Sequence, residues 1–389
     1  MSAASKKATL SLPLRIIFTQ EGSSQFINKR TKLKRMRLAD NTEEFGIETS
    51  TISPSILQRM FLADYIKQLE ISMPEFSSSR QDILDLSKLT VYGVLYKQMA
   101  KLVLSQIFET EVIKKYNRLN PSHMFDSKTE MPIATLRAKM LVMEKQYQTA
   151  KDELLKPVRA KIMARKDITI EEKNVYLLLS EKYLDNLSLY SWYLILRFFK
   201  GDDFAIIQKI VQPALQDFME KSQIAEYIAL MLMELAINSE NNNFRKEAKV
   251  MYRGIMDETT AIYDPEIRKK IISEMTRKRE FVSISWRFGG GSSNSIGMQN
   301  RLQITLYNKE DVYDEIKQNV DKTKVASSKD KSLIDFYNSD ATGQDDSSLG
   351  LYYLSYLSEA CQKVNVKFDS IVNQFSTNDL TVITLSFNF

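Results

Sequence analysis

The chain has 389 residues, a formal net charge of +5, 43% hydrophobic and 26% charged residues, as expected for a soluble globular protein of two or three domains. No apolar stretch reaches the roughly 20 residues of a membrane-spanning helix, and no apolar core of a signal peptide follows the amino-terminal lysines. Cys361 is the only cysteine and His123 the only histidine. An intrachain disulfide, a thiolate metal cluster and a multi-histidine site are therefore excluded, and a reduced cytoplasm is the expected location.

The first 55 residues are polar and predict a mobile, partly ordered arm with one short strand near 14–19. Within this arm six basic side chains crowd into nine positions: Lys29, Arg30, Lys32, Lys34, Arg35 and Arg37. This pattern favours a solvated basic arm. Nucleic acid, an anionic lipid surface and an acidic protein are the partners that such a cluster would attract.

Residues 56–200 are expected to form a separate helical domain. Ser53 followed by Pro54 predicts the start of a helix, which is expected to run to about residue 70. Apolar residues then recur at spacings of three and four over 83–165. Thr169 is expected to cap a further helix that ends near residue 189.

Residues 201–389 begin with two more helices, and the pattern changes near residue 280. Alternation with period two predicts strands over 281–288 and 301–308, followed by a long polar loop. A helix over 350–364 and two antiparallel strands, 366–375 and 380–389, complete the chain. The predicted fold class is α+β: an N-terminal helical region followed by a C-terminal α/β sandwich, whose mixed sheet is covered by helices on one face.

Two polar side chains interrupt the helix predicted over 222–238, which is apolar nearly all round and is therefore expected to be buried. Glu234 and Asn238 are four residues apart and lie on one stripe of this helix. Burying them without partners would cost several kcal/mol, so hydrogen bonds, a metal ion or a solvent-filled cleft are required. The alternative is structural: the polar run after Asn238 marks a helix end, and Glu234 is ion-paired.

The order of these elements resembles the GHKL-type ATP-binding domain shared by Hsp90, type II topoisomerases, MutL and sensor histidine kinases. The resemblance covers roughly residues 200–389 and implies a Bergerat fold. Glu234 and Asn238 resemble the N-box of that family, in which the Asn holds Mg²⁺ against the triphosphate and the Glu activates water. Ser348 and Gly350 resemble its last glycine box, where a helix N-terminus receives phosphate oxygens.

The chain departs from this family at its glycines. The adenine-reading Asp-x-Gly-x-Gly is absent, and Asn308 stands at the end of the second strand, where an amide oxygen could accept the same hydrogen bond. His123 lacks the context of a phosphoacceptor, so a histidine kinase is not expected.

Two functions remain open. The first is a regulatory or scaffold protein on a degenerate GHKL ATPase-like domain, acting through protein interaction. The second is a module that binds ATP and Mg²⁺ and is at most a weak ATPase, with the helical half regulating it. In the second, Glu234 is catalytic, Asn238 holds the metal, and Asn308, Ser348 and Gly350 bind the nucleotide.

Overall fold

The computed structural model describes residues 9–28, 32–126, 131–166, 168–253, 263–289, 301–309, 349–375 and 380–389. Two compact units divide the chain: unit 1 comprises Met1–Val94 and Gln223–Phe389, and unit 2 comprises Leu95–Ser222. The first division falls inside helix α3 (Arg80–Phe108), so this helix contributes its first half to unit 1 and its second half to unit 2.

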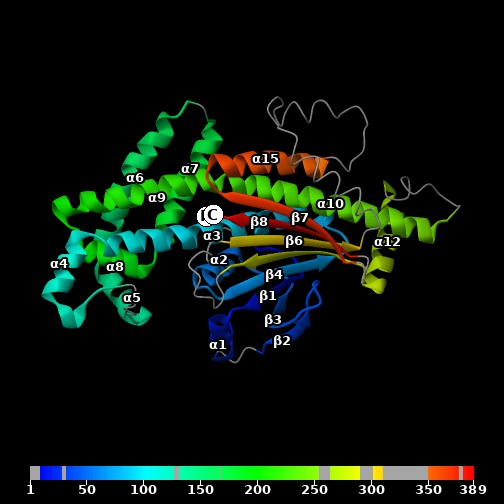
Figure 1. The fold of residues 1–389 in the computed structure, drawn as a ribbon, viewed down its shortest axis with the longest axis horizontal. Coiled ribbons are helices and arrows are strands. Elements are labelled where there is room, and N and C mark those ends of the chain that lie inside the picture. Colours follow the sequence, from blue (N-terminus) through cyan, green and yellow to red (C-terminus); the bar gives the residue numbers. More distant parts are fainter. Residues whose placement is uncertain are drawn as a thin grey trace, which may run out of the picture. The chain divides into compact units, whose positions relative to one another are not determined.

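Unit 1 is built on an eight-stranded sheet with the order β2-β3-β1-β4-β5-β6-β8-β7 (Figure 1). Its strands are β1 Leu14–Phe18, β2 Lys34–Arg37, β3 Glu43–Thr49, β4 Ile66–Met73, β5 Val282–Phe288, β6 Arg301–Lys309, β7 Lys367–Phe375 and β8 Leu380–Asn388. The four C-terminal strands confirm the predicted positions. Every described pairing is antiparallel, so the expectation of a mixed sheet is wrong. The reason is that β8 inserts between β6 and β7 and runs opposite to both.

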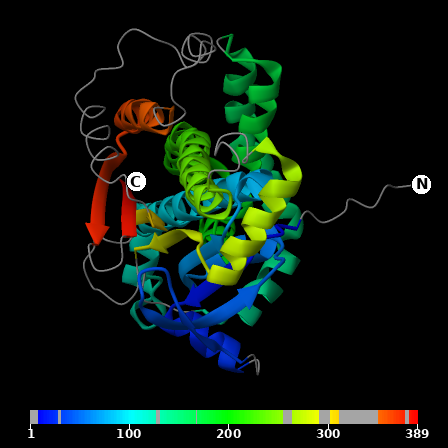
Figure 2. The ribbon, with the colours of Figure 1, turned by 90° about the vertical axis from the view of Figure 1, so that its right-hand side faces the viewer.

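One face of this sheet is apolar. Period-two alternation directs Ile284 and Trp286 of β5, and Ile304 and Leu306 of β6, to this face, where each is at most 2% exposed. Helix α10 (Ile224–Met251) packs against β5 and β6 there, and helix α15 (Leu349–Lys363) runs beside α10 (Figures 1 and 2). This face is the core of unit 1.

The opposite face of the same strands is polar. Ser283, Ser285, Thr305 and Tyr307 alternate with the apolar side chains and pair across β5 and β6. Part of this face is covered by the chain that follows β2, because Leu38 packs with Ile17 and Met36. A polar, partly covered surface of this kind is suited to hold a ligand.

The remaining α-helices among the described residues of unit 1 are α1 (Gln20–Asn28), α2 (Pro54–Leu62) and α12 (Pro265–Lys278). Ser53 is the N-cap of α2, as expected. The predicted extension of this helix to about residue 70 is wrong, because residues 66–73 form β4. Apolar residues at 66, 69 and 71 fit helical spacing as well as strand alternation, and pairing with β1 and β5 decides between them.

Unit 2 is helical over the residues described. Its helices, besides the second half of α3, are α4 Glu111–Leu119, α5 Ile133–Val142, α6 Glu144–Ala164, α7 Ile170–Asp185, α8 Leu189–Phe198 and α9 Phe204–Ser222. Thr169 caps α7 and forms a capping box with Glu172, which confirms its predicted role. Across the described ranges of both units, no helix has the length and apolar character needed to cross a membrane.

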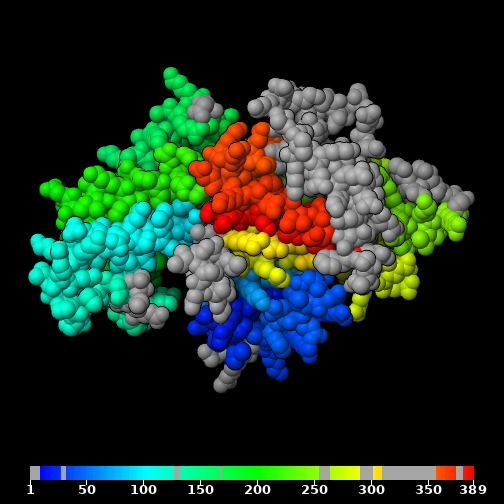
Figure 3. Space-filling view, in the orientation of Figure 1, coloured from blue at the N-terminus to red at the C-terminus, as the bar shows by residue number. Residues whose placement is uncertain are grey.

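The predicted division at residues 55 and 200 differs from the observed units. Residues 14–49 supply three strands of the sheet instead of a mobile arm. The space-filling view shows the blue of the N-terminal strands below the yellow of the strands near residue 300, and β4 lies between them in the strand order (Figure 3). The segment belongs to unit 1 because β1 pairs with β4, and β4 pairs with β5.

Candidate functional site

The two polar side chains predicted as an N-box lie on α10 but do not face the sheet together. Glu234 Oε1 forms an ion pair with Arg80 Nη2 at 3.3 Å, and its side chain is 19% exposed. Asn238 is half-buried, one turn further along α10. The ion pair expected for Glu234 under the structural alternative is therefore present. The helix end expected after Asn238 is not, because α10 continues to Met251.

The predicted adenine-reading residue is placed at the end of β6, as expected, but it is 1% exposed. Asn308 Oδ1 accepts a hydrogen bond from Asn243 Nδ2 at 2.8 Å. Asn243, rather than Asn238, is therefore the α10 residue that reaches this strand. Helical spacing could have indicated it, because residues 236, 239 and 243 lie on one stripe, and the first two are buried.

Opposite Asn308 lies Thr381 of β8. Its side chain is 1% exposed, and its hydroxyl makes no hydrogen bond within the described part of the chain. Gly350 is the second residue of α15, so a helix does begin where the resemblance implies it, while Ser348 lies outside the described residues. A buried hydroxyl beside Asn308 is thus the one unsatisfied polar atom at this end of the sheet among the residues described.

These positions do not fit the Mg²⁺ and ATP roles that the resemblance implies. A hydrolytic carboxylate must be able to approach water, but Glu234 is engaged by Arg80. The acceptor of Asn308 already serves Asn243. No cluster of three acidic, histidine or cysteine side chains suited to a metal occurs in the described ranges. The structure therefore gives no support for assembling a hydrolytic step from these residues.

The most strongly bonded polar group on α10 is one that the sequence did not single out. Glu240 is fully buried, and its carboxylate accepts from the backbone N–H of Phe76 at 2.5 Å and from that of Ser77 at 3.0 Å. The Ser77 hydroxyl also donates to it, at 2.5 Å, and Arg268 of α12 forms an ion pair with it. This contact set joins α10, α12 and the chain before α3, which is a structural role.

Hydrogen bonds organise the polar face of the sheet. Gln68 Nε2 donates to Ser285 Oγ at 2.8 Å, and Arg287 Nε donates to Gln68 Oε1 at 3.1 Å. Arg287 also pairs with Asp40 at 3.1 Å, which fixes the chain after β2 onto this face. Next to this network, the hydroxyls of Ser72 and Ser283 lie 2.8 Å apart.

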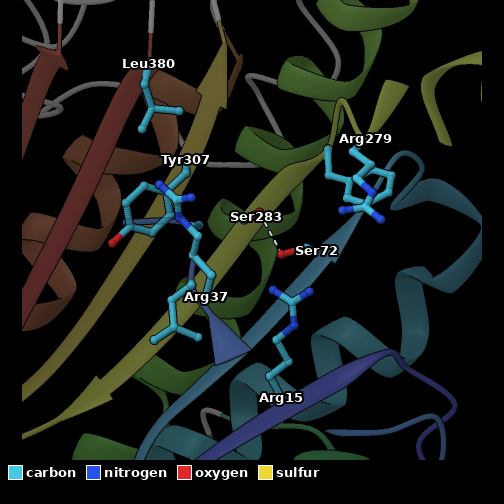
Figure 4. Close-up of a pocket in the computed structure, with 10 residues that line it drawn as sticks. Arg15, Arg37, Ser72, Arg279, Ser283, Tyr307 and Leu380 are labelled. Carbon is cyan, nitrogen blue, oxygen red and sulfur yellow. Dashed lines mark hydrogen bonds between the residues drawn. The ribbon is translucent and has the colours of Figure 1, made fainter. Parts of the chain in front are cut away.

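A pocket of about 250 Å³ opens at this Ser72–Ser283 pair (Figure 4). Three arginines line the pocket, Arg15, Arg37 and Arg279. The rest of its wall is formed by Leu38, Ala39, Phe281, Tyr307 and Leu380. Figure 4 shows Arg15 rising from β1 towards Ser72, with Arg37 and Arg279 on either side of the serine pair. No acidic side chain is among these lining residues.

Charge is distributed unevenly around this pocket. Arg15 pairs with Glu70 at 3.1 Å and Glu48 at 3.6 Å. Burial raises the pKa of the Glu70 carboxyl, against the opposing effects of the Ala39 N–H and Arg15. The side chains of Arg37 and Arg279 are exposed and make no ion pair or hydrogen bond with another described residue. The pocket therefore carries an excess of positive charge.

The predicted basic cluster is thereby divided among several environments. Lys34, Arg35 and Arg37 belong to β2, Arg35 pairs with Glu43, and Arg37 lines the pocket. Lys29 and Arg30 lie outside the described residues, and Lys32 precedes β2. The described part of the cluster therefore does not form a single continuous basic arm.

Comparison with known proteins identifies the family to which the chain belongs. A model described as "Family of unknown function (DUF8084)" matches residues 5–389. The chain belongs to this family. A relative described as an uncharacterized protein of Treponema pallidum (strain Nichols) is 36% identical over 389 residues, which covers 100% of both chains. No solved structure matches the chain.

Proposed function

We propose that this DUF8084 member is a cytoplasmic regulatory or scaffold protein that acts through protein contacts, built on a degenerate GHKL ATPase-like domain. The observation that carries the proposal is that the side chains of Asn308 and Glu234 both have partners within the chain. The first is buried and bonded to Asn243, and the second is paired with Arg80. Side chains that already have intramolecular partners lose those contacts if they bind a nucleotide, which opposes binding.

The order of elements in unit 1 supports the degenerate domain. Helix α10 is followed by α12, β5 and β6, then α15, β7 and β8, and the sheet runs β5-β6-β8-β7 with α10 and α15 packed together. This is the order of elements from which the resemblance to the GHKL family was inferred. Strands β1 to β4 add to the edge of that arrangement at β5.

The surface of unit 2 supports a role in protein contact. Eleven of the seventeen large apolar side chains exposed among the described residues lie in this unit, which is about a third of the chain. On α7, Ile170, Val175 and Leu178 are each more than half exposed. Exposed apolar side chains concentrated on one region are characteristic of interaction sites.

Thermal unfolding of the full chain with about 5 mM ATP and Mg²⁺ tests the nucleotide part. The proposal predicts no shift of the unfolding temperature. A ligand present at about 1,000 times its Kd would add about 4.1 kcal/mol, so a Kd in the micromolar range would be plainly visible. Stabilisation of the wild type that is lost in Asn238→Ala would contradict the proposal and establish the Mg²⁺·ATP alternative.

One observation favours that alternative, namely the buried Thr381 hydroxyl opposite Asn308. A bound base could supply the missing hydrogen-bond partner, because adenine carries both donors and acceptors. In that case Thr381→Val should weaken ATP binding, and Glu234→Ala should keep binding while abolishing any hydrolysis. Unchanged ATP affinity in Thr381→Val would remove this argument.

The protein-contact part is tested by capture with matched variants. Val175→Asp and Leu178→Asp place a charge on the exposed apolar face of α7, and Val250→Asp places the same charge on an exposed apolar position of unit 1. A partner should be captured by the wild type and by Val250→Asp, and lost with the other two. Capture that is equal in all four proteins would refute a role for this face.

A further inference from the structure

We propose that the arginine-lined pocket on the polar face of the sheet binds a small phosphate-bearing ligand, either free phosphate or a phosphate monoester. This site lies on the opposite face from Asn308, because Tyr307 is the neighbouring residue in β6 and successive side chains alternate between faces. It is therefore separate from the nucleotide position considered above.

Charge balance selects an anion. Of the three guanidinium groups, that of Arg15 already has two acidic partners, Glu70 and Glu48. The other nearby acid, Asp40, is held by Arg287 at 3.1 Å. Arg37 and Arg279 are left without an acidic partner in the described part of the chain. Two positive charges exceed what one carboxylate offers, whereas a phosphate monoester carries a charge of about −1.5 to −2 near neutral pH.

The backbone at Arg279 gives a second, independent indication. This residue is the C-cap of α12 and has φ 58° and ψ 38°, in the left-handed region. Glycine is the usual residue at such a position, because other side chains are strained there. The other non-glycine residues with positive φ among those described are Asn and Asp, which tolerate it better. An arginine in this conformation, with its side chain at the pocket, is consistent with a binding role.

The hydroxyl groups of the pocket supply oriented donors. Ser72 and Ser283 share one hydrogen bond of 2.8 Å. Since each serine has a single hydroxyl hydrogen, one of the pair donates to the other and the second keeps its hydrogen for a ligand. Burial raises the pKa of Tyr307 to about 12, so its hydroxyl stays protonated and can also donate. Donors and positive charge together match the acceptor oxygens of phosphate.

Size and apolar lining limit the ligand. The volume of about 250 Å³ is below the roughly 300–1,000 Å³ of sites for drug-sized molecules, so the pocket can enclose a phosphate with a small organic group but not a whole nucleoside triphosphate. Phe281 and Leu380 contribute apolar surface to the same wall. A phosphate joined to a small organic group would use both the arginines and this surface, whereas free phosphate would use the arginines alone.

Isothermal titration calorimetry at constant ionic strength tests this proposal with phenyl phosphate, inorganic phosphate and benzoate as probes. The site variant is Arg37→Gln with Arg279→Gln. Its matched control is Lys34→Gln with Lys270→Gln, which removes two positive charges from exposed positions of the same elements, β2 and α12, whose side chains form no ion pair with another described residue. Both arginines of the site are exposed, so their replacement is not expected to prevent folding.

Phenyl phosphate is expected to bind the wild type and the control with Kd values within about twofold, and the site variant at least tenfold more weakly. If phenyl phosphate binds more tightly than inorganic phosphate, the ligand is a monoester. If the two bind equally, the site is one for phosphate alone. Equal loss of affinity in control and site variant, benzoate binding as tight as that of phenyl phosphate, or no binding at about 10 mM would each overturn the proposal.

Discussion

Replacing Glu240 is expected to destabilise unit 1 more than replacing any other acidic residue of α10. Its carboxylate accepts from two backbone N–H groups and one hydroxyl and pairs with Arg268, all in a fully buried position. Removing one partner of a buried pair costs about 3–5 kcal/mol, which is the expected loss for Glu240→Ala. Glu240→Gln keeps an acceptor but loses the charge, so a loss of about 2–3 kcal/mol is expected.

The two tryptophans make this measurement specific. Trp286 is buried in β5 of unit 1, and Trp192 is buried in unit 2. In a Trp192→Phe background, the fluorescence of Trp286 during urea unfolding reports unit 1 alone. Glu234→Ala serves as the control, because its partly exposed ion pair is expected to contribute at most about 1 kcal/mol. If Glu240→Ala costs no more than this control, the structural role assigned to Glu240 is wrong.

Three further predictions concern single side chains. Arg279→Gly should raise the free energy of unfolding by about 1 kcal/mol, because glycine adopts the left-handed backbone without strain; a less stable variant in urea would contradict this. Burial raises the pKa of Glu70 above 4.5, so the stability it contributes is complete below pH 4.5 and is lost as pH rises through the raised pKa. Glu70→Gln should therefore gain stability relative to wild type across that window in urea titrations, whereas a pH-independent difference would argue against it. Burial raises the pKa of Cys361 to about 12, so iodoacetamide at pH 8 should modify it far more slowly in the folded chain than in urea; equal rates would show that α15 opens readily.

Local patterns sufficed to predict the C-terminal strands and most helices. Alternation in 282–288 and 301–309, and the capping box at Thr169, depend on residues close in sequence. They therefore act on the chain before any distant contact forms. The same reasoning found the short strand β1 and the start of α2 at Ser53.

Long-range pairing explains what the sequence did not predict. The strand β4 joins the N-terminal strands to β5, and the bond from Gln68 to Ser285 spans 217 positions. Alternation indicates that a segment is a strand, but it does not identify the partner. Strand β2, with the sequence KRMR, is hidden further by its charges, which resemble a solvated arm. Both strands were missed in the sequence, and the boundary predicted at residue 55 followed from this.

The candidate sites also differ in how far local sequence patterns could predict them. Asn308 was expected at the end of a strand, and it lies there, because strand ends follow from alternation. Its partner on α10, Asn243, was not singled out, because a helix that is apolar on nearly every side gives no indication of which stripe meets the sheet. The arginine pocket combines residues from β1, β2, β4, β5 and β6 with the C-cap of α12, so no local motif could have indicated it.

The opposite faces of one sheet make the two binding proposals independent. Asn308 and Tyr307 are adjacent in β6, yet their side chains point to opposite faces. Asn238→Ala should therefore leave phenyl phosphate binding unchanged, and the Arg37 and Arg279 variants should leave any response to Mg²⁺·ATP unchanged. Coupling between the faces would require a shift of β6 or β8, because each of these strands contributes residues to both positions. A change in phosphate affinity on adding ATP would thus indicate that one ligand moves one of these strands, and it would assign to the sheet a signalling role that neither site has alone.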